Sequence, residues 1–381
     1  MAQRLFEGVD SFVGSKNSRK TQEAYRRSIL MFGEMKFGEI DRGAMIRKLD
    51  GYIRKADLQA IMTDIQAFKN YLGTKKLAIR SSRLYIAALQ SWFSNNQLQI
   101  PKNKSKELRG RIKPTTDDKA FTLETAKMVL DQMKSPVSRS FFFFLLSTGA
   151  RMGEALQVKL SNVDWKAKPV TVWLDESITK TGEGRHVFLT SEAAEFIRKV
   201  WLTPTDDDGV VLSNRERFMR AAMNKGKGLG ITRPRIEIDD RVWPFESPTA
   251  HKFISTAIRR AGYNAKTKTG LSQLHPHSTR KFFRTIFGRA AGPDAAEEIM
   301  GHAGYLTGSY RKTERDELAA IFLKHESALH INLTPEARHA METRDLHAAA
   351  IVQLQQQNKR LVKDMEIMKR IINRGSEVEK S

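Results

Sequence analysis

SFFFFLLSTGARMGEAL, residues 140–156, joins the most apolar segment of the chain to a pair of charged side chains. Its first half predicts a buried helix that ends at Gly149, because glycine readily adopts the conformation that terminates helices. Arg151 and Glu154 follow three residues apart on a new helical turn, where their side chains can pair. A guanidinium held in this way beside an apolar core is suited to binding a phosphate, although such a pair alone is most often structural.

The sequence around this segment predicts a mixed domain. Residues 170–177 and 185–190 have the composition of strands and flank the turn sequence ThrGlyGluGly. Helical spacing of apolar residues is found at 121–133, 191–202, 213–225, 247–262 and 278–291 in this part of the chain, and at 18–35, 56–72 and 80–95 nearer its start. The expected fold is therefore mainly α with a small antiparallel β-sheet (α+β), with a purely helical domain in front.

Composition limits the function classes. The 381 residues contain no cysteine, which excludes disulfides, Cys-ligated zinc, iron–sulfur clusters and thiol catalysis. The longest apolar run, Phe141 to Leu146, is too short to cross a membrane, and the first residues do not resemble a secretion signal. The 65 Lys and Arg against 43 Asp and Glu give a formal charge of +22, which indicates a polyanionic partner. We expect a cytoplasmic, nucleoid-associated protein that binds double-stranded DNA.

The positive charge is concentrated near the start of the chain. Residues 1–120 hold 24 Lys and Arg against 12 Asp and Glu. The densest stretch, 101–113, opens with a proline and lacks apolar periodicity, so residues 101–119 are expected to be a linker. It is either a solvated spacer or a segment that lies along DNA phosphates. Its candidate DNA-binding residues are Lys102, Lys104, Lys106, Arg109, Arg111 and Lys113.

Two further motifs carry residues suited to chemistry. HPHSTRKFFR, residues 275–284, places His277 and Arg280 on one helical face, and MGHAGYLTGSYRK, residues 300–312, holds His302 and Tyr310. Two arginines, two histidines and a phenol on a basic protein suggest attack of tyrosine on a phosphodiester. A free tyrosine has a pKa near 10, so it needs a base and nearby cations to act as a nucleophile. This scheme requires no metal ion.

Taken in order behind a basic helical segment, these motifs resemble those of the tyrosine recombinases, also called the phage-integrase family. The resemblance runs through residues 18–315 and implies a core-binding domain and a catalytic domain that clamp duplex DNA. It also implies cleavage and rejoining through a 3′-phosphotyrosyl intermediate and a Holliday junction, by four copies on two sites, without metal, ATP or other cofactor. The roles it assigns are phosphate clamps for Arg151 and Arg280, nucleophile for Tyr310, general base for His277, general acid for Lys180, transition-state donor for His302 and orienter of the first arginine for Glu154.

Two positions depart from the family pattern. Tyr310 follows His302 by eight residues where many members have nine, and Gly304 and Gly308 indicate a loop that can absorb the difference. Tyr305 is the alternative phenol. Lys281 stands where many members have histidine, and we expect it to add a cation at the DNA.

The end of the chain carries a heptad pattern of apolar residues, with one asparagine at an a position. The seam consists of Ile351, Leu354, Asn358, Leu361, Met365, Met368 and Ile372. It favours a coiled-coil dimer, and the alternative is one amphipathic helix that folds back on the core. The expected domains are 1–100 for core binding, 101–119 for the linker, 120–330 for catalysis and 331–381 for a helical tail.

Three other functions fit parts of the sequence. A DNA-binding or architectural protein could keep this fold without cleavage, but such a protein has no physical need for all six of Arg151, Lys180, His277, Arg280, His302 and Tyr310. A type IB topoisomerase would share the chemistry. HisProHis also resembles the metal-binding motif of relaxases, which requires a strand where the sequence predicts the start of a helix.

Overall fold

The structure is a computed structural model, and it divides into two compact units at residues 116 and 117. It describes residues 7–75, 77, 79–109, 117–207, 210–228, 239–267, 270–301 and 314–332, and the single positions 357, 358, 361 and 365. Most of the predicted heptad seam at 351–372, as well as Arg111 and Lys113, therefore lies outside the described residues. Among the described residues, no helix combines the length and the apolar character needed to cross a membrane.

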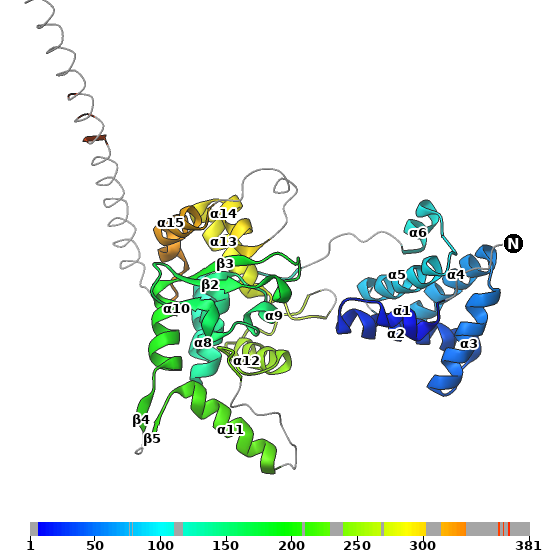
Figure 1. Ribbon diagram of the computed structural model, residues 1–381, viewed down its shortest axis with the longest axis horizontal. Helices are drawn as coiled ribbons and strands as arrows, with labels where there is room; N and C mark the ends of the chain where they lie inside the picture. The colour runs from blue at the N-terminus through cyan, green and yellow to red at the C-terminus, as the bar shows by residue number, and fades with distance from the viewer. Residues whose placement is uncertain are drawn as a thin grey trace, which may run out of the picture. The chain divides into compact units, whose positions relative to one another are not determined.

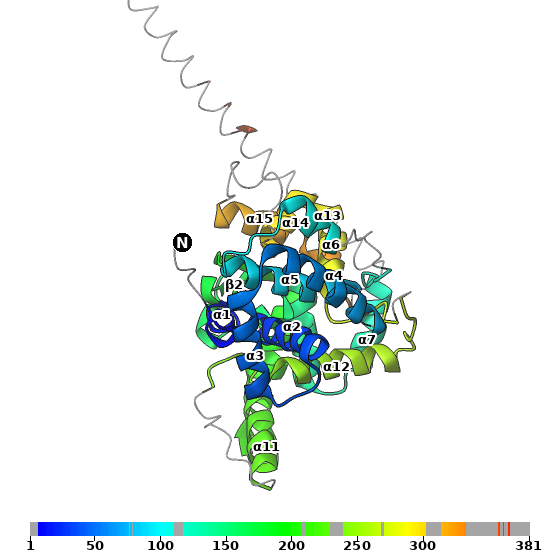
Figure 2. The same ribbon diagram turned by 90° about the vertical axis from the view of Figure 1, so that its right-hand side faces the viewer.

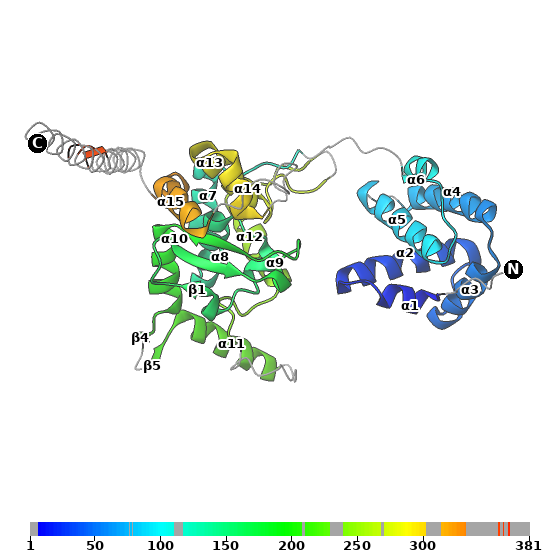
Figure 3. The same ribbon diagram turned by 45° about the horizontal axis from the view of Figure 1, so that its top comes forward.

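The first unit is entirely helical in its described part (Figure 3). Its helices are α1 (Val9–Gly14), α2 (Arg19–Phe37), α3 (Arg42–Lys55), α4 (Leu58–Thr74), α5 (Ile79–Asn95) and α6 (Lys102–Arg109). The helices predicted near 18–35, 56–72 and 80–95 are confirmed as α2, α4 and α5, whereas α1, α3 and α6 were not predicted. Ser18 caps α2 by accepting a hydrogen bond from the backbone N–H of Thr21 at 3.1 Å.

Helix α6 corrects the expectation that residues 101–119 form a linker throughout. Residues 102–109 are helical, and Leu108 is buried in the core of the first unit. The Ser105 hydroxyl donates to the Gln90 side chain on α5 at 3.0 Å, which holds the helix against its neighbour. One buried leucine among otherwise polar and charged residues, in a helix of only eight residues, is too weak a pattern to reveal a helix from sequence. The exposed lysines Lys102, Lys104 and Lys106 remain on its surface.

The second unit combines helices with two small sheets (Figure 1). Before and within the first sheet come α7 (Leu123–Asp131), α8 (Pro136–Thr148), α9 (Met152–Ala155), β1 (Val163–Asp164), β2 (Val170–Leu174) and β3 (Arg185–Leu189). The remaining elements are α10 (Ser191–Phe196), a π-helical turn (Ile197–Leu202), β4 (Thr205–Asp207), β5 (Val210–Leu212), α11 (Asn214–Gly228), α12 (Ser247–Arg260), α13 (Ser278–Ala291), α14 (Pro293–Met300) and α15 (Arg315–His325).

The three-stranded sheet is antiparallel in the order β1-β2-β3. In its register Val170 pairs with Leu189 and Trp173 with His186, so the turn between β2 and β3 carries Lys180. The predicted strands and the helices of this unit are confirmed, and the fold is mainly α with a small antiparallel sheet. The short β4–β5 hairpin lies where no strand was predicted. Helix α11 contacts α8 and extends away from β2 (Figure 2).

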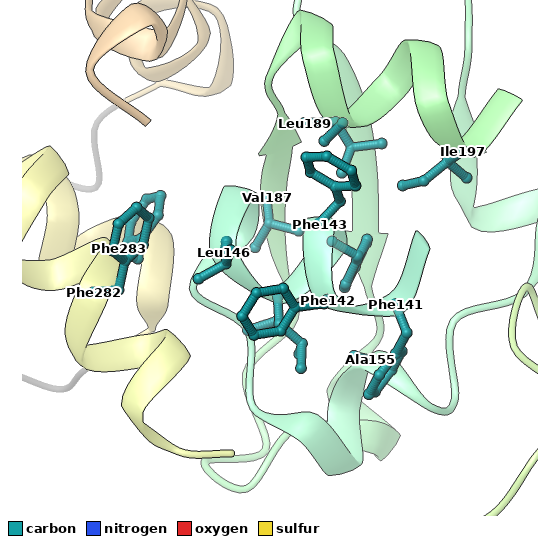
Figure 4. Packing of buried hydrophobic residues seen from close by; sticks show 14 of the residues in the cluster. Phe141, Phe142, Phe143, Leu146, Ala155, Val187, Leu189, Ile197, Phe282 and Phe283 are labelled. Atoms are coloured by element: carbon teal, nitrogen blue, oxygen red, sulfur yellow. The ribbon is translucent and has the colours of Figure 1, made fainter. Parts of the chain in front are cut away.

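Helix α8 forms the interior of the second unit, as its run of phenylalanines predicts. Leu146 lies between buried side chains of β3 and α13, whereas Phe141 lies beside Ala155 of α9 (Figure 4) and packs its ring on Trp243 at 5.5 Å between centroids. The helix ends at Gly149, which adopts the left-handed conformation at φ 60°. A Cβ atom there would lie 2.6 Å from the ring of Phe283 on α13, so only glycine lets the two helices approach this closely. This close approach brings the residues that follow α8 next to the start of α13.

Candidate active site

The first predicted pair forms as expected at the start of α9. Arg151 donates from Nη1 to Glu154 Oε1 at 2.8 Å, and the backbone N–H of Arg151 donates to Glu154 Oε2 at 3.1 Å. Glu154 is 2% exposed, so its carboxylate is almost fully removed from water. The carboxylate therefore fixes both the backbone and the guanidinium of Arg151.

Arg280 lies on the first turn of α13 and is 3% exposed. Its Nη1 donates to the carbonyl of Gly149 at 2.6 Å, and its Nη2 donates to the carbonyl of Met300 at 2.8 Å. One guanidinium thus joins the end of α8 to the end of α14. The three motifs singled out in the sequence meet at this side chain, since Gly149 belongs to the first and Met300 to the third.

A third arginine, Arg185, belongs to the same cluster, and sequence analysis missed it. Its Nη2 donates to Glu154 Oε2 at 2.6 Å, and its Nε donates to the carbonyl of Ile299 at 3.1 Å. Gly301 adopts φ 64°, and a Cβ there would lie 2.7 Å from Cδ of Arg185. The base of the β2–β3 hairpin is therefore attached to both Glu154 and the end of α14.

The cluster carries more positive than negative charge. Arg151, Arg185 and Arg280 lie around the carboxylate of Glu154. Burial alone would raise the pKa of Glu154, but the hydrogen bond and charge of Arg185 and the hydrogen bonds from Arg151 outweigh it and lower the pKa. Burial and the charges of Arg151 and Arg185 lower the pKa of Arg280 to about 9, so the guanidinium stays charged at neutral pH at an energetic cost. In the part of the chain that is described, the buried N–H groups at Nε of Arg280 and Nη1 of Arg185 have no hydrogen-bond partner. These features suit an anion with several acceptor oxygens.

His277 lies directly before α13 and lines the same cavity as Arg280. Partial desolvation of the imidazole, with the positive charges of Arg280, His275, Lys281 and Arg151, lowers its pKa, although its side chain keeps an exposed side. The neutral form, which can accept a proton, is therefore favoured at pH 7. The helix start predicted for HisProHisSerThrArg is confirmed, because α13 begins at Ser278.

Asp118 contacts His275 and Lys281, on either side of the start of α13, and sequence analysis did not single it out. Its carboxylate accepts from Lys281 Nζ at 2.6 Å and lies 3.3 Å from His275 Nε2. The backbone N–H of His277 donates to His275 Nδ1 at 3.2 Å, which places the His275 proton on Nε2, facing Asp118. The charge of Lys281, which we expected to face DNA, is thus paired with a carboxylate.

The pKa of Asp118 makes this contact testable. Burial alone would raise it, but the hydrogen bonds from Lys281 and His275 and the charge of Lys281 lower the pKa to about 2. Because the pKa of this carboxyl is lower in the folded than in the unfolded protein, its ionised form stabilises the fold at pH values above about 4, the ordinary pKa of an aspartate. This contribution is lost as the pH falls from about 4 towards the pKa in the folded protein. We expect Asp118→Asn to lower the free energy of unfolding by about 2 kcal/mol at neutral pH.

Urea denaturation of the wild type and Asp118→Asn between neutral pH and about pH 3 measures this effect. The difference should shrink below pH 4, and Asp117→Asn, a change at the exposed neighbour, should leave stability unaltered. A loss that stays constant with pH would contradict the ionic role of Asp118.

The remaining candidates are placed only in part. Lys180 is exposed in the β2–β3 turn, five residues before Arg185. Tyr310, Tyr305 and His302 lie outside the described residues, as does the side chain of Arg109. Within the described residues, a cavity of about 190 Å³ opens beside Arg280, and His277, His275, His251 and Met152 contribute to its wall. No group of three His, Asp or Glu side chains in this part of the chain is arranged to hold a metal ion.

Comparison with known families identifies the chain. A family model described as the phage integrase family matches residues 119–314, just over half of the sequence. The chain belongs to this family. In this member, the matched region includes the Arg151 motif, the Arg280 motif and Tyr310, whereas Asp118 lies one residue outside it.

Three solved structures that the chain resembles have low sequence identity to it, between 13% and 17%. XerA recombinase is 17% identical, with 88% of this chain and 95% of that chain covered and a TM-score of 0.34. A lambda integrase (75–356) dimer bound to a COC′ core site is 15% identical, with coverage of 81% and 97% and a TM-score of 0.47. The Tn1549 transposon integrase in complex with transposon right end DNA is 13% identical, with coverage of 89% and 99% and a TM-score of 0.49. No curated protein gives a significant match, and the family assignment rests on the family model.

Proposed function

We propose that this protein is a site-specific DNA recombinase that cleaves and rejoins duplex DNA through Tyr310. The observation that carries the proposal is the cluster of Arg151, Arg185 and the buried Arg280 around the buried carboxylate of Glu154. Its surplus charge and its two unpaired N–H groups fit the non-bridging oxygens of a phosphodiester. Membership of the phage integrase family supports the same conclusion.

The proposed reaction divides into one bond formed and one bond broken. The phenolic oxygen of Tyr310 attacks the phosphorus, and the bond from phosphorus to the leaving 5′-oxygen breaks. His277 accepts the phenolic proton, and Lys180 donates a proton to the 5′-oxygen. The arginines hold the extra negative charge that develops on the non-bridging oxygens in the transition state, with His302 as a further donor.

The product is a 3′-phosphotyrosyl link and a free 5′-hydroxyl. The hydroxyl of a partner strand then attacks the same phosphorus and releases the tyrosine, which exchanges strands through a Holliday junction. The covalent link retains the energy of the phosphodiester, so the scheme uses no ATP. The arginines supply the positive charge at the phosphate, so the scheme requires no metal ion.

Binding of DNA is proposed to involve the basic residues of the first unit and its continuation. Lys102, Lys104 and Lys106 are exposed on α6, which supports a role in contacting phosphates. Arg109, Arg111 and Lys113 continue the same basic segment, and Lys281 contributes less because Asp118 neutralises it. We further propose that four copies act together on two sites, and that the seam 351–372 pairs two of them.

Covalent trapping tests the function directly. The substrate is DNA that flanks the gene of this protein, with a nick placed shortly beyond the cleavage point. After cleavage, the short fragment that carries the 5′-hydroxyl dissociates, so religation cannot occur. We expect the wild-type protein to accumulate a covalent adduct with this DNA in EDTA, seen as a shifted band on a denaturing gel. Binding without any adduct would favour the non-catalytic alternative. Adduct formation with relaxation of supercoiled circles, but without exchange between two sites, would favour a topoisomerase.

A further inference from the structure

The loop between β2 and β3 is the segment that would deliver the general acid. Its inner part is fixed by local hydrogen bonds, since the backbone N–H of Ile178 donates to the carbonyl of Asp175 at 3.1 Å and the Thr179 hydroxyl donates to the carbonyl of Glu176 at 3.1 Å. Its tip, residues 180–183, is exposed. The bond from Gly182 N–H to the Thr179 carbonyl, at 3.4 Å, closes the tip on itself without attaching it to the sheet.

Trp173 is the side chain that joins the two arms of this loop. It lies on β2 opposite His186 on β3, and the two rings are 4.7 Å apart between centroids. A Cβ atom on Gly184 would lie 2.5 Å from Cζ2 and 2.7 Å from Cη2 of the indole. The indole therefore rests directly on the backbone at the returning arm of the loop, although it is anchored in the outgoing arm.

The same tryptophan also lies at the start of the loop. Asp175 accepts from the backbone N–H of Ser177 at 3.0 Å and from its hydroxyl at 2.6 Å, which begins the short helical turn at Glu176–Ile178. The missing Cβ of Gly184 would also lie 3.4 Å from the backbone nitrogen of Glu176. The start and the end of the loop, at Glu176 and Gly184, thus lie close together beside the indole of Trp173. This side chain is 37% exposed and belongs to neither hydrophobic core.

We propose that Trp173 is a positioning residue, which holds the β2–β3 loop so that Lys180 meets the leaving 5′-oxygen. The inference rests on the role of Lys180 in the proposed function. A loop fixed at both arms needs less ordering when DNA binds, and small errors in the placing of a catalytic group are costly for rate. Arg185, which begins the returning strand, anchors the other side of the loop at Glu154.

A sulfur atom in place of the leaving 5′-oxygen tests this role. A thiolate leaves without protonation, since thiols have a pKa near 8.5, so the general acid becomes dispensable. With the ordinary substrate, we expect Trp173→Ala to slow adduct formation about tenfold or more. With the sulfur substrate, its rate should return close to the wild-type rate. Lys180→Ala should follow the same pattern with a larger initial loss.

Two variants keep the test decisive if Trp173→Ala disturbs folding. Gly184→Ala leaves the backbone in an allowed conformation but pushes the indole away, so it should reproduce the defect and its rescue. Trp165→Ala removes a partly buried indole from the turn between β1 and β2 and should not show the selective rescue.

The outcomes separate the inference from the proposed function. If Lys180→Ala is rescued by sulfur while Trp173→Ala and Gly184→Ala are equally impaired on both substrates, or unimpaired on both, the positioning role is wrong and the function stands. If Lys180→Ala is not rescued, Lys180 is not the general acid, and the inference falls with that assignment.

Discussion

Tyr310→Phe is expected to abolish the covalent adduct with nicked DNA while leaving DNA binding intact. Phenylalanine keeps the ring but removes the oxygen that would attack the phosphorus. Loss of the nucleophile in covalent enzymes costs on the order of 10⁴-fold or more in rate, so the adduct should fall below detection on a denaturing gel. DNA affinity, measured by a mobility shift at fixed salt, should change little, because one hydroxyl contributes little beside many phosphate contacts.

Tyr305→Phe is the matched control, since it removes the alternative phenol five residues earlier in the same segment. We expect this variant to form the adduct at close to the wild-type level. The reverse result, an adduct with Tyr310→Phe and none with Tyr305→Phe, would reassign the nucleophile. Adducts from both single variants would require a third residue, which the double variant and mapping of the attached peptide would reveal.

The parts of the site that sequence predicted are those with local causes. Arg151 and Glu154 are three residues apart and meet at the start of α9, where Arg151 is the cap residue, so their contact depends on local spacing. Gly149 marks the end of α8 because a left-handed cap favours glycine. The position of Arg280 beside the Arg151 motif could be inferred only from the resemblance to the family, because these side chains are brought together by the packing of α13 on α8.

The missed residues depend on contacts between distant segments. Arg185 meets Glu154 across 31 residues, and its place follows from the register of β2 and β3. Asp118 pairs with Lys281, which is 163 residues away in the sequence. Asp118 lies in residues 101–119, which the sequence predicts to be a linker. A signal was nevertheless present for Arg185, since an arginine directly after the loop that carries the predicted general acid lies close to that chemistry in any hairpin.

Arg280→Ala is expected to slow adduct formation by on the order of 10²-fold or more, which corresponds to about 3 kcal/mol of transition-state stabilisation. Arg280 is the most buried of the three guanidiniums and one of the two with an unpaired N–H group. Its benefit should appear mainly in the transition state, when negative charge on the phosphate increases. We therefore expect the rate at saturating protein to fall far more than the DNA affinity.

The same arginine also donates to the carbonyls of Gly149 and Met300, so a structural explanation of any loss must be separated from an electrostatic one. Thermal unfolding checks that Arg280→Ala is folded, and Arg289→Ala, at an exposed position on the same helix, controls for the loss of one positive charge. A neutral methylphosphonate at the scissile position provides the sharper test. Because this substrate develops less negative charge, the gap between wild type and Arg280→Ala should narrow on it if the guanidinium acts on charge. An equal gap on both substrates would reduce Arg280 to a structural link between α8 and α14.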